Sequence, residues 1–278
     1  MISDDFEVAA GSVIGRDHLR SLGWKNNQDS FAIRATENAI VAVVTDGCGS
    51  ESKSEVGATI GAALVAESLI EEYCMFGGNA ELAEILTGAR WRTLVHVRLT
   101  AKAMGKDLKQ VIYEHFLFTV NGALVTPRET VMFSVGDGIQ FVNGERIPLG
   151  PFANNAPPYL AYTLLAAPGA EDPANDFRIT AALPTESVQS LLVGTDGVEH
   201  LIAAELECLP GRSELVGPIS QFWREDRYFK NPDMVRRRLA LTQNEHLAVD
   251  WRERVIHRAP GKFPDDTTLV ALRRKPKR

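Results

Sequence analysis

Several aspartates stand where an apolar run of residues begins or ends. Three of these runs finish in an Asp-Gly step, as in VVTDG, FSVGDG and LLVGTDG, and a fourth, TTLVAL, is preceded by Asp-Asp. Carboxylates that meet at the rim of a core repel one another and lose hydration unless a cation neutralises them. Oxygen ligands of this kind suit hard divalent cations such as Mg²⁺ and Mn²⁺. The aspartates concerned are Asp46, Asp137, Asp196, Asp265 and Asp266.

The competing explanation is that these steps are only turns. Asp-Gly is the commonest turn dipeptide, so each step alone is better explained as a hairpin corner, by roughly four to one. Three such steps after apolar runs, together with Asp-Asp-Thr-Thr before the last run, are difficult to obtain by accident. The set as a whole therefore favours a cation site.

Apolar periodicity predicts the elements that must position these aspartates. We expect strands at 7–15, 30–35 and 39–47, a helix at 54–73, and a helical stretch at 80–104 that breaks near Gly88. Asn-Gly and proline turns between apolar runs at 115–150 predict a meander of antiparallel strands. Residues 151–173 are rich in proline and other breakers, which predicts a surface loop or flap. The rest of the chain is expected to form two strands, FRITAAL and SLLVGTDG, a helical block with Met234 to Leu247, and a last strand TTLVALRR.

Composition narrows the class of protein. A chain of 278 residues that is 45% hydrophobic can form a substantial core. Because the sequence shows neither repeats nor a linker, we expect one domain over 1–278, with a basic tail at 273–278. The three cysteines form no CxxC pair, which argues against a disulfide framework or a zinc knuckle. A net charge of −6 argues against general binding to nucleic acid or anionic lipid. The sequence has neither an export signal nor a membrane-spanning run, so we expect a cytoplasmic protein with no nucleic-acid or membrane partner.

The order of the motifs resembles that of a known family. The chain contains QDSF (28–31), TDGCGS (45–50), VGDG (135–138), GTDGV (194–198) and DDTTLVAL (265–272), and the resemblance to the PPM or PP2C-like metal-dependent protein phosphatases, in particular their bacterial branch, extends from Gly11 to Leu272. The resemblance implies an α+β fold, a four-layer αββα sandwich of two antiparallel sheets flanked by helices. It implies hydrolysis of phosphoserine and phosphothreonine in a phosphorylated protein substrate by water held between two Mn²⁺ or Mg²⁺ ions, a possible third ion, and a serine/threonine kinase as the opposing enzyme.

The same resemblance assigns roles to individual residues. Asp46 would bridge two ions, the carbonyl of Gly47 would hold the second, and Asp196 and Asp265 would hold the first. Asp137 would form a weaker third site shared with Asp196. Asp29 would sit beside the centre as a partner of metal-bound water. Asp266 stands where the family usually has Asn and is expected to orient its loop.

Three positions depart from the family pattern. Gln28 replaces the usual Glu, and its amide oxygen can still bind a cation directly or through water. Trp24 replaces a phosphate-binding Arg, for which Lys25, Arg20 and Arg16 are alternative substitutes. Cys48 replaces a His thought to act as general acid, and a thiol is a poor replacement at neutral pH. His18 is therefore the candidate for proton transfer or, with about equal weight, for a structural hydrogen bond.

Other classes of phosphatase fit less well. A cysteine phosphatase needs Arg six residues after its nucleophile, where Cys48 has Ser54. A haloacid-dehalogenase-type enzyme needs a second Asp two residues after the first, where Asp46 has Cys48. The serious alternative is a catalytically degenerate module that binds phosphoproteins or scaffolds a partner, suggested by the three departures. Retention of Asp46, Asp196 and Asp265 favours the enzyme.

Overall fold

The computed structural model describes residues 1–20, 26–51, 53–76, 80–105, 107–150, 152, 156–167, 169–170 and 172–276, and the fold is described over these ranges. None of the described helices combines the length and apolar character that crossing a lipid bilayer requires.

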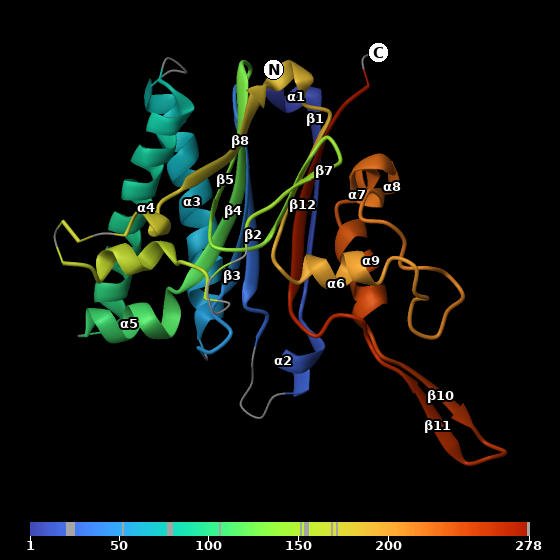
Figure 1. The fold of residues 1–278 in the computed structure, drawn as a ribbon. Helices are drawn as coiled ribbons and strands as arrows, with labels where there is room; N and C mark the ends of the chain where they lie inside the picture. The colour runs from blue at the N-terminus through green and yellow to red at the C-terminus, as the bar shows by residue number, and fades with distance from the viewer. Residues whose placement is uncertain are drawn as a thin grey trace.

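Two five-stranded antiparallel sheets form the middle of the protein (Figure 1). The first sheet has the order β1-β12-β9-β6-β7 and the second has the order β2-β3-β4-β5-β8. The first comprises β1 (Phe6–Val13), β12 (Thr267–Arg274), β9 (Ser190–Gly194), β6 (Ile139–Val142) and β7 (Glu145–Ile147). The second comprises β2 (Asp29–Ala35), β3 (Ile40–Gly47), β4 (Phe118–Val125), β5 (Glu129–Val135) and β8 (Arg178–Pro184).

Helices cover both outer faces of this pair of sheets (Figure 1). The second sheet is covered by α3 (Ser54–Phe76) and α4 (Leu82–Met104), with α5 (Leu108–His115) beside them. The first sheet is covered by α6 (Val198–Ala203), α7 (Gln221–Arg224), α8 (Arg227–Lys230) and α9 (Met234–Gln243). Short helices α1 (Ile2–Asp5) and α2 (Arg16–Arg20) flank β1, and 3₁₀ turns occur at Leu160–Leu164, Pro173–Asn175 and Thr185–Ser187. The predicted four-layer αββα sandwich is confirmed.

The strand β3 shows why a continuous apolar run fits this architecture. Its side chains alternate between the two faces of the sheet, so Val41 and Val43 pack against the helices while Ala42 and Val44 pack between the sheets. Both destinations are apolar and all four residues are at most 1% exposed. A strand buried on both faces therefore needs no polar alternation.

Two predicted features of the middle of the chain are wrong. The stretch 115–150 is not one meander, because β4 and β5 lie in the second sheet whereas β6 and β7 lie in the first. The chain crosses at the VGDG motif, where Gly136 and Gly138 have φ of 89° and 128°, conformations that favour glycine. The helix α4 also continues through Gly88, at which an added Cβ would lie 2.5 Å from Oε2 of Glu72 on α3.

Two further differences concern segments outside the sheets. Within the predicted flap, Leu160–Leu164 form a 3₁₀ helix whose residue Leu160 is 1% exposed, so this part is packed onto the α3–α4 layer. The predicted helical block containing Leu247 ends at Gln243, and the chain continues into an antiparallel hairpin of β10 (His246–Asp250) and β11 (Val255–Ala259). The apolar spacing there was compatible with either element, and the helix assignment was incorrect.

Candidate active site

A polar pocket of about 180 Å³ opens at the end of the sandwich where β3 ends and β12 begins. Its lining includes seven of the eight predicted site residues, among them the carbonyl-bearing Gly47, and the eighth, Asp29, is buried and does not line it. The lining residues are His18, Gln28, Asp46, Gly47, Cys48, Gly49, Thr119, Asp137, Pro157, Tyr159, Asp196 and Asp265.

Strand register brings the aspartates together from both sheets. In the second sheet, Asp29 pairs directly with Asp46 across β2 and β3. In the first sheet, Gly194 pairs with Leu269 on one side and Ile139 on the other. Asp196 follows Gly194 by two residues, Asp137 precedes Ile139 by two, and Asp265 precedes β12. Three segments distant in sequence therefore deliver carboxylates to one place.

The glycines of the TDG steps allow close packing at this end of the sheets. A Cβ on Gly47 would lie 2.8 Å from the Ser54 hydroxyl, at the start of α3. A Cβ on Gly197 would lie 1.8 Å from the carbonyl oxygen of Asp266, which is a collision with backbone. These glycines are therefore required by the approach of neighbouring segments, in addition to any turn preference.

Asp266 is an organising residue of the loops around the pocket. It is 2% exposed, and its two carboxylate oxygens accept hydrogen bonds from the backbone N–H groups of Gly15 (2.6 Å) and Gln28 (2.5 Å). His18 on α2 places Nδ1 2.9 Å from the same carboxylate, while its Nε2 lies 3.7 Å from Asp265. These contacts match the loop-orienting role expected for Asp266.

Gln28 is held so that its amide oxygen remains available. Its Nε2 donates to the carbonyl oxygen of Glu51 (2.7 Å) and to the hydroxyl of Ser54 (2.6 Å), which fixes the orientation of the amide. Its Oε1 is buried and has no hydrogen-bond partner among the described residues. An unsatisfied buried acceptor is costly, so this atom fits a cation or a bound water.

The electrostatics of the pocket are those of uncompensated negative charge. Burial, followed by the charges of Asp29 and Asp196, holds the pKa of Asp46 well above its usual range. Burial and the charges of Asp265 and Asp137 raise the pKa of Asp196 to about 6, and burial also raises the pKa of Asp137. No Lys or Arg with a described side chain forms an ion pair with these three aspartates, and none is among the causes of their pKa shifts. A divalent cation would supply the missing charge.

The geometry also brings a histidine into the same group. Among the described residues, His18, Asp265 and Asp266 can each offer a ligand atom within 4.8 Å of the others. The nitrogen of His18 that faces Asp266 is already in contact with it, so the oxygen-rich set around Asp46 is the better candidate for a hard cation.

Comparison of the sequence with family models now decides the family. The model for protein phosphatase 2C matches residues 14–240, which is most of the chain. The chain belongs to the protein phosphatase 2C family. This family is metal-dependent, and the donors described above fit that property. A comparison with curated proteins gave no significant match.

Solved structures similar to this protein phosphatase 2C chain share its fold. A bacterial serine phosphatase aligns with 14% identity and a TM-score of 0.51, covering 98% of this chain and 99% of the other. The serine/threonine phosphatase Stp1 from Staphylococcus aureus aligns with 14% identity and a TM-score of 0.51, covering 98% of this chain and 96% of the other. A sex-determining protein of C. elegans aligns with 13% identity and a TM-score of 0.54, covering 98% of this chain and 65% of the other.

The pocket of this protein phosphatase 2C contains residues that sequence reasoning did not identify. Thr195 donates its hydroxyl to Asp29 (2.7 Å) and accepts from the backbone of Thr268 (3.1 Å), joining the two sheets behind Asp46. Its position before Asp196 in the GTDGV motif was the available signal. Tyr159 comes from the segment beside the 3₁₀ helix, and burial raises the pKa of its phenol far above the usual range. No motif marked Tyr159.

The predicted substitutes for the phosphate-binding arginine are not supported by contacts. Arg16 donates through Nη1 to the carbonyl oxygen of Gly261 (3.1 Å) and contacts Asp17, and it does not line the pocket. Trp24 and Lys25, and the side chain of Arg20, lie outside the described residues.

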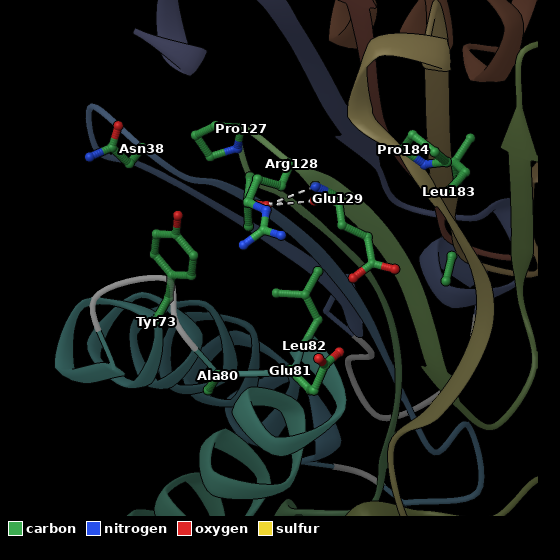
Figure 2. Close-up of a pocket in the computed structure, with 12 residues that line it drawn as sticks. Asn38, Tyr73, Ala80, Glu81, Leu82, Pro127, Arg128, Glu129, Leu183 and Pro184 are labelled. Carbon is green, nitrogen blue, oxygen red and sulfur yellow. Dashed lines mark hydrogen bonds between the residues drawn. The ribbon is translucent and has the colours of Figure 1, made fainter.

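A larger cavity, of about 600 Å³, lies at the opposite end of β3 (Figure 2). It is bordered by the turn at Asn38, by Tyr73 near the end of α3 and by the β4–β5 turn at Arg128. Figure 2 shows Glu81 and Glu129 on different walls of this cavity, without the convergence of carboxylates seen around Asp46. It is therefore not the candidate active site.

Proposed function

We propose that this chain hydrolyses phosphoserine and phosphothreonine monoesters in proteins with the help of two Mn²⁺ or Mg²⁺ ions. The observation that carries the proposal is the convergence of Asp46, Asp196, Asp265 and Asp137 in one pocket without a described basic partner on Asp46, Asp137 or Asp196. Such an arrangement destabilises the folded state unless cations occupy it.

The residues fit the cations in the way that the family resemblance suggests. Asp46 would be shared between the two ions, with Asp196 and Asp265 on one and the Gly47 carbonyl on the other. The Oε1 of Gln28, which has no hydrogen-bond partner among the described residues, would join the second ion directly or through water. Asp137 remains the candidate for a third ion. When bound, such ions lower the pKa of water and neutralise charge on a phosphoryl group.

The chain's own groups would then orient the reactants. Asp29, buried and held by the Thr195 hydroxyl, presents a carboxyl group next to Asp46 that can accept a proton or a hydrogen bond from water. His18 places Nδ1 2.9 Å from Asp266 and Nε2 3.7 Å from Asp265 at the pocket. We propose that His18 carries a proton at Nε2 for the leaving oxygen of the substrate.

The catalytic proposal is tested by metal-dependent hydrolysis. The purified protein is assayed with p-nitrophenyl phosphate and with a phosphothreonine peptide in Mn²⁺, then with EDTA, and with Asp46→Asn. Activity should require the metal and fall roughly 100- to 1,000-fold in Asp46→Asn, the range for loss of one preorganised electrostatic contact. Asp17→Asn, at an exposed acid on α2, is the matched control and should retain activity.

The role of His18 requires a separate comparison of the two substrates. A nitrophenolate leaves without a proton, whereas the alkoxide of threonine needs one, so His18→Gln should slow the peptide much more than p-nitrophenyl phosphate. Equal losses would remove the proton-transfer role and leave the structural one. Absence of metal-dependent turnover with both substrates would support the non-catalytic binding module instead.

A further inference from the structure

The hairpin of β10 and β11, which we call the arm (residues 246–259), stands apart from the body of the protein (Figure 1). Its two strands form a sheet of their own, and among the described strands none pairs with either outer edge. All residues of the two strands are exposed except the half-buried Asp250 and Ala259. Two-stranded hairpins of this kind are marginally stable alone, and their free edges can accept another strand.

The arm exposes apolar side chains that the rest of the fold does not use. Val249 pairs with Ile256 across the two strands, so their side chains share one face, and they are 47% and 54% exposed. Leu247 lies two residues from Val249 on the same face, and Trp251 at the tip is 84% exposed. Contiguous exposed apolar residues on a projecting element indicate an interaction surface.

The root of the arm is joined to the walls of the candidate active site. Directly after β11, the carbonyl oxygen of Gly261 accepts a hydrogen bond from Arg16 Nη1 (3.1 Å) and that of Phe263 accepts one from the Arg16 backbone (2.9 Å). Arg16 begins α2, which carries His18, and two residues after Phe263 the chain reaches Asp265. Figure 1 shows α2 and the arm at the same end of the molecule.

The charge of the arm differs from that of the chain as a whole. Residues 246–259 contain three arginines and two acidic residues, whereas the whole chain carries −6. Arg258 is 3.6 Å from Glu245, but no ion pair is formed by Arg252 or Arg254 within the described structure. A groove of about 650 Å³ at the root is lined by Arg212, Lys262 and Glu207, and Lys262 donates to Glu207 (2.5 Å), so Arg212 is the cation that the groove adds beyond this pair. The arm, with its surplus of one positive charge and with Arg252 and Arg254 outside any described ion pair, therefore favours an acidic segment more than the chain as a whole does.

We propose that the arm docks an extended, acidic and apolar segment of the phosphoprotein substrate, which adds to the hairpin as a further strand. The inference rests on the proposed phosphatase function, since it assigns the docked chain to the substrate. Backbone hydrogen bonds along a free edge would hold the segment, the face of Val249 and Ile256 would take its apolar side chains, and Arg252 and Arg254 would take its acidic ones. The phosphorylated residue would then be presented to the nearby pocket at high local concentration.

The experiment compares a small substrate with an unfolded acidic phosphoprotein. The double variant Val249→Lys with Ile256→Lys is matched by Val95→Lys with Leu99→Lys, which alters exposed apolar residues on α4. With phosphorylated casein, the arm variant should show a KM about tenfold higher, the effect of losing a modest interface contact. Hydrolysis of p-nitrophenyl phosphate should be unchanged in both variants. Equal KM values for casein in the arm and control variants would overturn the proposal.

Binding is measured independently of catalysis with casein from which the phosphates have been removed. The emission of Trp251, obtained as the difference between the wild-type protein and Trp251→Phe, should shift to shorter wavelength as casein is added, and the arm variant should abolish this shift. A shift in a protein that hydrolyses nothing would retain docking and reject the phosphatase function. Hydrolysis of casein without any shift would retain the phosphatase function and reject docking on the arm. A concentration-dependent dimer that the arm variant dissociates would assign the surface to a second copy and overturn the proposal.

Discussion

Asp29 and Glu72 are each 7% exposed, yet the two regions around them treat a buried carboxylate differently. At the α3–α4 interface, Arg92 donates to Glu72 from Nε (2.8 Å) and Nη2 (2.6 Å) and also approaches Glu71 (3.2 Å). In the pocket, Asp29 receives a hydroxyl from Thr195 but has Asp46 as its direct strand partner, and burial followed by the charge of Asp266 holds its pKa well above the usual range. The fold thus pairs the buried Glu72 with an arginine, whereas the buried Asp29 lies beside another carboxylate and forms no ion pair with a described Lys or Arg side chain.

Among tests of this difference between the pocket and the α3–α4 interface, the largest effect is expected from removing one charge from the pocket. Asp265→Asn should lower metal-dependent turnover roughly 100- to 1,000-fold because one electrostatic contact to a cation is lost. The free energy of unfolding of the metal-free protein should change by less than about 0.5 kcal/mol, since this side chain is half exposed and pairs with no Lys or Arg whose side chain is described. Steady-state assays and urea unfolding measure the two quantities. A large loss of stability with intact turnover would make Asp265 a structural acid like Glu72.

The opposite pattern is expected at the helix interface. Glu72→Gln should reduce the free energy of unfolding by about 2 kcal/mol, the contribution of charge-assisted hydrogen bonds to Arg92. Turnover per folded molecule should stay the same, because none of the described residues that line the pocket belongs to α3 or α4. Urea unfolding monitored by circular dichroism gives the stability, and Glu84→Gln on an exposed turn of α4 is the matched control. Unchanged stability would show that the ion pair is not what offsets burial there.

The smallest effect concerns pH. The pKa of Asp196 is raised from 3.8 to about 6 in the folded protein, so between these values the native state holds a proton that the unfolded chain releases. Stability from this group is therefore lost as pH rises from about 4 to 6, and Tm of the metal-free protein should fall a few degrees more than in Asp196→Asn. Mn²⁺ should stabilise the protein more at pH 7 than at pH 5, because protons compete for the same oxygens. Parallel Tm profiles for the two proteins would show that Asp196 is not so perturbed.

Local patterns predicted the strands of the two sheets and the helices α3, α4 and α9 because apolar periodicity reflects which side of an element is buried. The shorter helices α1, α2, α5, α6, α7 and α8 and the hairpin of β10 and β11 were not predicted. The strand β3 was recognisable from its β-branched run, and the two-sheet sandwich followed from the family resemblance. The errors occurred where two elements share one local pattern. The stretch around Leu247 has spacing compatible with a helix or a strand, and Gly88 has the composition of a break but the packing of a close helix contact with Glu72.

The sequence by itself determined which residues carry negative charge at the ends of apolar strands, since chain order places Asp46, Asp196 and Asp265 at fixed points relative to their strands. Only the tertiary structure decided that these points coincide, because register between strands far apart in sequence brings Asp29 against Asp46 and Asp265 near Asp196. It also decided which oxygen of the pocket lacks a partner, since the amide of Gln28 is oriented by Glu51 and Ser54. These contacts are selected by the energy of pairing between strands far apart in sequence, and local sequence preferences do not select them.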